Sequence, residues 1–179
     1  MHVYEEGLGL LEANEIFGNQ LNGIQVATKS RPTARRNRMF GQQTGVFVLD
    51  EGLGIFEEND IFDNSLSGVA VKGGKPAVRK NLIHGNNGNG VYAYEEAAPT
   101  VDANEIVDNG SDGVRVQESA SATLRKNTII RNGLYGIRVV DTGTVVAEDN
   151  DLRGNASGSW EVAEGATVEA RRNEEGDLP

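Results

Sequence analysis

Three pairs of adjacent carboxylates, each just after the first expected strand of its repeat, could by residue type support acid–base chemistry: Glu5/Glu6, Asp50/Glu51 and Glu95/Glu96. Glycoside hydrolysis needs two carboxyl groups at a set separation, and the one that acts as the acid must keep its proton near neutral pH. No long segment beside any of these pairs could bury it. The sequence therefore favours hydrated acidic turns, and we expect no catalytic residue and no enzyme activity.

Few residues could bind a metal. The chain has no cysteine and only two histidines, His2 and His84. The segment DNDLRG at 149–154 begins like a calcium-binding EF-hand loop, but Trp160 stands where that loop places its bidentate glutamate. His84 belongs to an aromatic and aliphatic column that favours packing over a ligand role. We therefore expect no metal and no cofactor.

These residues are embedded in a repeat. An asparagine recurs at intervals of 22 or 23 residues, at Asn14, Asn37, Asn59, Asn81, Asn104, Asn127, Asn150 and Asn173. A second polar column, mostly asparagine, follows five residues later, and then a glycine opens a short alternating stretch such as GVRV or GIRV. A unit this short holds three short strands and no helix, so only a coil of the backbone fits.

Stacked coils of equal length place like residues about 4.8 Å apart in parallel strands. The sequence therefore predicts an all-β fold, a three-sided single-stranded parallel β-helix of about eight coils of 22–23 residues, with residues 1–179 as one domain. Stacked asparagines can bond to the coils above and below, so the asparagine column is predicted to be a structural ladder rather than a site.

A charge column accompanies the ladder. Two residues before each ladder asparagine the sign alternates through Glu12, Arg35, Glu57, Arg79, Asp102, Arg125, Glu148 and Arg171. Each acid is predicted to lie between two bases on neighbouring coils. Such exposed pairs contribute little energy individually, but they oppose a slip of one coil because like charges would then meet.

Composition limits the partners. The net charge of −10 and the pI near 4.7 repel nucleic acids and anionic membranes. The N-terminal stretch is too acidic for a secretion signal, and no apolar run approaches the length of a membrane span. We expect neither a nucleic-acid nor a membrane partner, and a cytoplasmic location is favoured.

The alternation of EENDIFDN with VRKNLIHGN, joined by GVxV stretches, resembles the right-handed parallel β-helix repeats of the CASH type. Such repeats occur in carbohydrate-binding proteins, sugar hydrolases, bacterial right-handed β-helix repeat proteins and, most similarly, in the substrate-binding region of an F-box ubiquitin-ligase adaptor. The resemblance implies a pectin-lyase-like fold and a surface that binds a protein, a peptide or a carbohydrate.

One face carries outward residues that do not follow the stacking rule. The candidate binding residues are Phe47, Leu49, Tyr92, Tyr94, Arg115 and Arg138, with Asp50 and Glu95 along one rim. Aromatic and guanidinium groups suit a peptide strand or a sugar chain. An aromatic ladder that only stabilises the sheet is an equal alternative.

Two function classes follow. The first is a non-catalytic repeat scaffold that binds protein, peptide or carbohydrate along this face. The second is a relative of polysaccharide lyases, hydrolases or epimerases, which would need a groove with buried carboxylates. Because open strand edges pair readily, we also expect that the chain is a fragment of a longer repeat protein or that its ends associate.

Overall fold

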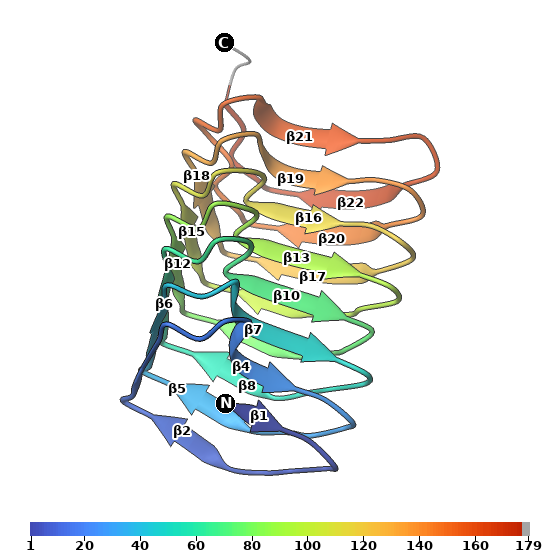
Figure 1. Cartoon of the computed structure of the whole chain (residues 1–179). Helices are drawn as coiled ribbons and strands as arrows, with labels where there is room; N and C mark the ends of the chain where they lie inside the picture. The colour runs from blue at the N-terminus through green and yellow to red at the C-terminus, as the bar shows by residue number, and fades with distance from the viewer. Residues whose placement is uncertain (177–179) are drawn as a thin grey trace.

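A computed structural model describes residues 1–176, and all of their regular secondary structure is β (Figure 1). The strands form three sheets, and the chain visits each sheet once per turn. Sheet A contains β1 (His2–Val3), β4 (Asn22–Val26), β7 (Thr44–Leu49), β10 (Val69–Lys72), β13 (Val91–Tyr94), β16 (Val114–Val116), β19 (Tyr135–Val139) and β21 (Gly158–Val162). Sheet B contains β2 (Leu10–Glu12), β5 (Thr33–Arg35), β8 (Ile55–Glu57), β11 (Ala77–Arg79), β14 (Thr100–Asp102), β17 (Ser121–Arg125), β20 (Thr144–Glu148) and β22 (Thr167–Arg171). Sheet C contains β3 (Glu15–Phe17), β6 (Arg38–Phe40), β9 (Asp60–Phe62), β12 (Leu82–His84), β15 (Glu105–Val107) and β18 (Thr128–Ile130).

The predicted coil is confirmed. Neighbouring strands in every sheet are parallel and come from consecutive turns, as where Val69 lies opposite Val91 and Val91 opposite Val114. Isolated bridges between Thr128, Asp151 and Glu174 continue the third side beyond sheet C. The chain makes about seven turns, close to the eight coils expected. At the usual strand spacing the stack is roughly 35–40 Å long.

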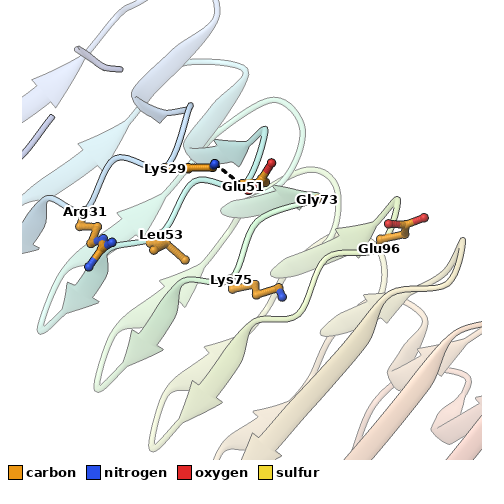
Figure 2. Close-up of a pocket in the computed structure, with 7 residues that line it drawn as sticks. All are labelled: Lys29, Arg31, Glu51, Leu53, Gly73, Lys75 and Glu96. Carbon is orange, nitrogen blue, oxygen red and sulfur yellow. Dashed lines mark ion pairs between the residues drawn. The ribbon is translucent and has the colours of Figure 1, made fainter. Parts of the chain in front are cut away.

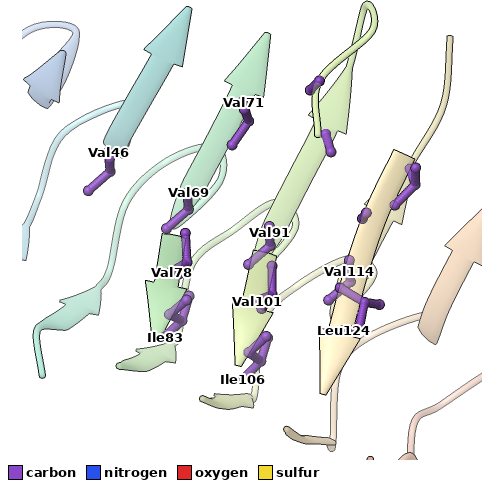
Figure 3. Close-up of a cluster of buried hydrophobic side chains, with 14 of the residues drawn as sticks. Val46, Val69, Val71, Val78, Ile83, Val91, Val101, Ile106, Val114 and Leu124 are labelled. Carbon is purple, nitrogen blue, oxygen red and sulfur yellow. The ribbon is translucent and has the colours of Figure 1, made fainter. Parts of the chain in front are cut away.

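The core is a set of inward columns, one for each side of the coil (Figure 3). Val69, Val91 and Val114 stack from sheet A. Val78, Val101 and Leu124 stack from sheet B, and Ile83, Ile106 and Ile129 stack from sheet C. All nine side chains are fully buried, so the alternation of each strand in the sequence is explained by one face turned to this core.

The asparagine ladder is confirmed bond by bond. In the middle of the rod, Asn104 Nδ2 donates to Asn127 Oδ1 at 3.0 Å, and the Asn104 main-chain N–H donates to the same oxygen at 2.9 Å. Asn104 Nδ2 also donates to the Val78 carbonyl at 2.9 Å, on the turn before. Side-chain bonds of this kind link all eight predicted positions, Asn14, Asn37, Asn59, Asn81, Asn104, Asn127, Asn150 and Asn173.

The ladder compensates for a strained bend between sheets B and C. The residue before each ladder asparagine has a left-handed backbone, as in Ala103 with φ of 53° and Lys126 with φ of 53°. This conformation costs a residue other than glycine about 1–2 kcal/mol. The buried amides supply the partners that the bent backbone cannot find within a sheet, which is why every turn carries one.

The charge column forms only in part. Arg35 Nε lies 2.9 Å from Glu12 Oε1, and Arg79 Nη2 lies 2.8 Å from Glu57 Oε2. Within residues 1–176, however, no acid of the column pairs with both of its neighbouring column bases. An exposed side chain placed between two coils leans toward one of them, so the prediction of an acid held between two bases was too regular. No helix in this range is long and apolar enough to cross a membrane.

Candidate functional site

The candidate face lies on the outer side of sheet A, where the strand register aligns it along the rod axis. Phe47, Ala70, Tyr92, Arg115 and Arg138 lie opposite one another on β7, β10, β13, β16 and β19. A parallel column two residues further along holds Leu49, Lys72 and Tyr94. The sheet therefore brings six of the predicted residues into one strip of side chains, apolar and aromatic at one end and cationic at the other.

The aromatic end of this strip contains a hollow of about 400 Å³. Its lining includes Asn22, Gln25, Phe47, Ser67, Ala70, Tyr92 and Tyr94. The hollow exists because the small side chain of Ala70 lies between the larger Phe47 and Tyr92 on the neighbouring strands, and the small Ser67 lies just before the same strand. The sequence analysis considered only long segments beside the acidic pairs as cover for a site, whereas here the sizes of the side chains alone form the depression.

Tyr92 and Tyr94 project from the same strand and stack, with ring centroids 4.5 Å apart and planes 17° apart. Both side chains are half-buried. Loss of hydration raises the pKa of both phenols above the usual value. Both hydroxyls are therefore protonated at neutral pH and can donate hydrogen bonds to a ligand.

The cationic end is held by neighbouring polar groups. Arg115 Nε donates to Gln117 Oε1 at 2.9 Å, which fixes the guanidinium beside Tyr92. Arg138 Nε lies 3.1 Å from Glu161 Oε2, and its guanidinium lies 5.9 Å from the centre of the Tyr135 ring. Both arginines are half-buried, so less of their conformational freedom is lost when they bind a ligand.

Asp112 lies buried near Arg115 and Arg138 of this strip, and its chemistry was not anticipated from the sequence. Its side chain is fully buried, and its Oδ1 accepts a hydrogen bond from the Tyr135 main-chain N–H at 3.2 Å. Its Oδ2 is also buried and has no hydrogen-bond partner. Burial raises the pKa of the Asp112 carboxyl, while the positive charges of Arg138 and Arg115 oppose that shift. The sequence does set Asp112 apart, because the equivalent positions on earlier turns hold uncharged residues, namely Asn22, Thr44, Ser67 and Asn89.

The predicted acidic rim is separate from the hollow. Asp50 and Glu95 follow β7 and β13, are exposed, and each has a left-handed backbone with φ of 49°. Glu95 Oε1 lies 3.2 Å from Lys72 Nζ, and neither acid lines the hollow beside Tyr92. The acidic rim therefore borders the strip without contributing to the hollow.

His84 belongs to a stack on the outer side of sheet C. Its ring lies 5.1 Å from Phe62, which stacks on Phe40 at 4.9 Å, and Phe40 stacks on Phe17 at 5.3 Å. The His84 Nε2 atom lies 2.9 Å from Asp60 Oδ1. The packing role expected from the sequence agrees with this geometry. Within the described range 1–176, no group of three or more acidic or histidine side chains is arranged to hold a metal ion.

Comparison with known proteins extends these observations. The model of the family described as "Right handed beta helix region" matches residues 22–174. Comparison with curated protein sequences gives no match. Several solved structures share the fold, and the chain spans about half the length of each.

One is the D317A mutant of the periplasmic alginate epimerase AlgG, with a TM-score of 0.89, 21% identity, and coverage of 97% of this chain and 46% of that one. A second is the A-module of the mannuronan C-5 epimerase AlgE6 of Azotobacter vinelandii, with a TM-score of 0.79, 21% identity, and coverage of 99% and 57%. A third is the catalytic unit of a thermostable GH87 α-1,3-glucanase of Streptomyces thermodiastaticus strain HF3-3, with a TM-score of 0.71, 16% identity, and coverage of 99% and 46%.

The expectation of a non-enzyme is contradicted by these similarities, because the similar structures are epimerases and a glucanase. The expectation rested on the short turns of the sequence, and the hollow on sheet A shows that side chains alone can form a depression there. At identities of 15–21% the similarities establish a shared architecture. The match of the family model over most of the sequence establishes the affiliation: the chain belongs to the right-handed β-helix family.

Proposed function

We propose that this chain is the polysaccharide-binding β-helix of a carbohydrate-active enzyme, and that the sugar chain lies along the outer face of sheet A. The observation that supports it is the strip in which the Tyr92/Tyr94 pair borders a hollow of about 400 Å³ and continues into Arg115 and Arg138. Sugar rings present apolar faces and hydroxyl edges. Aromatic rings and guanidinium groups match these two surfaces.

The repeat of the fold suits a polymeric ligand. A polysaccharide lying parallel to the rod axis meets a new strand about every 4.8 Å. The outward residues of successive strands lie in line along that axis. The half-buried side chains of the strip are already restrained by their neighbours, as Arg115 is by Gln117. Binding therefore orders few additional side chains.

Asp112 supplies the acid–base group that the sequence seemed to lack. A buried carboxyl oxygen without a hydrogen-bond partner, such as Asp112 Oδ2, costs stability, and such groups concentrate at functional sites. Its raised pKa makes the protonated form available nearer to neutral pH than for an exposed aspartate. Because Oδ2 is buried, a bound sugar reaches it only when a neighbouring side chain moves. We assign to Asp112 the transfer of a proton to or from the bound sugar.

The test is a panel of neutral and acidic polysaccharides screened for binding and for turnover, with the wild-type chain and two variants. Tyr92→Ala removes one stacking ring and should weaken binding about tenfold, the equivalent of about 1.4 kcal/mol. Asp112→Asn should retain binding and lose turnover. Arg131→Gln is the control, because Arg131 pairs with Asp108 away from this strip.

Equal affinity of Tyr92→Ala and wild type for every bound polymer would exclude sheet A as the binding face. Binding without turnover by the wild-type chain would leave the binding face in place and remove the role of Asp112. A protein or peptide partner and association of rods through their ends stay predictions, to be tested by pull-down and by sedimentation.

A further inference from the structure

A second cavity lies at the turn between sheets A and B. It has a volume of about 530 Å³, and Figure 2 shows the residues that line it. Its lining includes Lys29, Arg31, Glu51, Leu53, Lys75 and Glu96. None of these residues belongs to the outer strip of sheet A that carries Tyr92, so this turn groove is a separate site.

One wall of the turn groove repeats along the rod axis. Arg31, Leu53 and Lys75 occupy equivalent positions on three successive turns, because Leu53 N–H donates to the Ser30 carbonyl and Lys75 N–H to the Gly52 carbonyl, both at 2.9 Å. Arg31 and Lys75 are therefore two strand spacings apart, or about 10 Å. Leu53 lies between them. The wall thus has a cation, an apolar side chain and a second cation in line.

These two cations are available to a ligand. Across residues 1–176, neither Arg31 nor Lys75 has an ion-pair partner, and both side chains are exposed. On the opposite wall Lys29 is paired with Glu51, at 3.7 Å, and Glu96 adds a second carboxylate. The two unpaired cations give this wall a local positive charge in a chain whose net charge is −10.

We propose that the turn groove binds an extended acidic polysaccharide, with one carboxylate or sulfate of the polymer on Arg31 and another on Lys75. The apolar face of the sugar between them contacts Leu53. Glu51 and Glu96 repel the anionic groups and hold the polymer on the cationic wall. This site is independent of the function proposed for sheet A, since it uses none of the same side chains.

A polysaccharide suits this groove better than an acidic peptide does. The main-chain groups of the floor already bond between successive turns, as in Lys75 to Gly52 and Ala98 to Gly74 at 2.8 Å. A peptide strand would therefore find no free edge for backbone pairing, which supplies much of the affinity in that mode of recognition. A sugar polymer needs only side-chain contacts, and the wall provides these at a regular spacing.

The experiment measures binding of a short oligouronate to the whole chain by calorimetry and by backbone NMR shifts. The test variant is Arg31→Gln/Lys75→Gln, and the matched control is Lys80→Gln/Lys126→Gln. The control makes the same change in net charge at exposed residues outside the groove. We expect the test variant to weaken binding at least tenfold and the control to weaken it less than twofold, with shifts at Leu53 and Gly73 in the wild type.

Two comparison ligands and one further variant complete the test. The carboxyl-reduced, neutral oligosaccharide should not shift Leu53 or Gly73, and polyglutamate should bind more weakly than the oligouronate. Equal binding by the test variant and the control, or stronger binding of polyglutamate, would overturn the proposal. Tyr92→Ala should leave the shifts at Leu53 unchanged, so failure at the turn groove is distinguishable from failure at sheet A.

Discussion

Replacement of one buried ladder asparagine tests the main structural inference. Asn104→Ala removes the two hydrogen bonds that its Oδ1 accepts from Asn81. It also removes the two N–H donors of Nδ2, which serve Asn127 Oδ1 and the carbonyls of Val78 and Asp102, one donor being shared between two acceptors. Counted as four bonds at about 1 kcal/mol net each, the free energy of unfolding should fall by about 4 kcal/mol. The buried main-chain N–H of Asn81 is left without its acceptor, which makes this loss hard to offset by relaxation.

The matched control is Asn14→Ala, the same substitution in the same column. Asn14 is exposed and donates to Asn37 Oδ1 and the Glu12 carbonyl, where water can replace the lost bonds. Its cost should be below about 1 kcal/mol. Urea unfolding followed by circular dichroism gives the global change, and amide exchange at Asn81 gives the local one. Repeat rods can unfold in parts, so both are needed. Similar losses for the two variants, or an unchanged exchange rate at Asn81, would refute the reasoning.

Three further predictions follow from the geometry. Gly113→Ala should destabilise the fold by about 1–3 kcal/mol in thermal unfolding, because a Cβ there would lie 2.2 Å from Ile129 Cγ2. Ala103→Gly should stabilise it by about 0.5–1 kcal/mol in the same assay, since relief of the left-handed strain exceeds the entropy cost of glycine. Burial raises the pKa of Asp112, so the folded state binds that proton more tightly than the unfolded state does. The wild type therefore loses stability as the pH rises from the unfolded-state pKa to the folded-state pKa of Asp112, whereas Asp112→Asn has no carboxyl to titrate there. When the free energy of unfolding is measured against pH, Asp112→Asn should become more stable relative to wild type across that range. A flat difference between Asp112→Asn and wild type would contradict it.

The fold was predictable because its constraints repeat. Each turn restates the same asparagine, the same inward residues and the same glycine, so a column in the sequence predicts a column in space. The strand positions of Val69, Val91 and Val114 followed directly from this register. The expected pairing of each column acid with two bases failed because exposed side chains have room to choose one partner, and the repeat does not specify which.

The site was predictable only in part. The outward positions of Tyr92, Tyr94, Arg115 and Arg138 follow from alternation along a strand, which the sequence contains. The hollow beside Tyr92 depends on the small size of Ala70 on a neighbouring turn, and the state of Asp112 depends on what covers it. Both properties arise between turns. They need the actual packing of side chains that are not adjacent in the sequence.

The bonds from one ladder asparagine side chain to the next all run one way. In the first column the side-chain amide of each turn donates to the side-chain oxygen of the following turn, from Asn14 toward Asn173. The second column follows the same direction from Asn19 toward Asn155, except at Gln42, whose main-chain N–H donates to Asn64 Oδ1 in place of its side-chain amide. Dipoles aligned in this manner add, and hydrogen bonds in a chain polarise one another. The side-chain amides therefore give the rod a net dipole along its axis, with the negative pole toward Asn14 and the positive pole toward Asn173. Ions diffusing past the two extremities would meet opposite potentials even if every ionised side chain were neutralised.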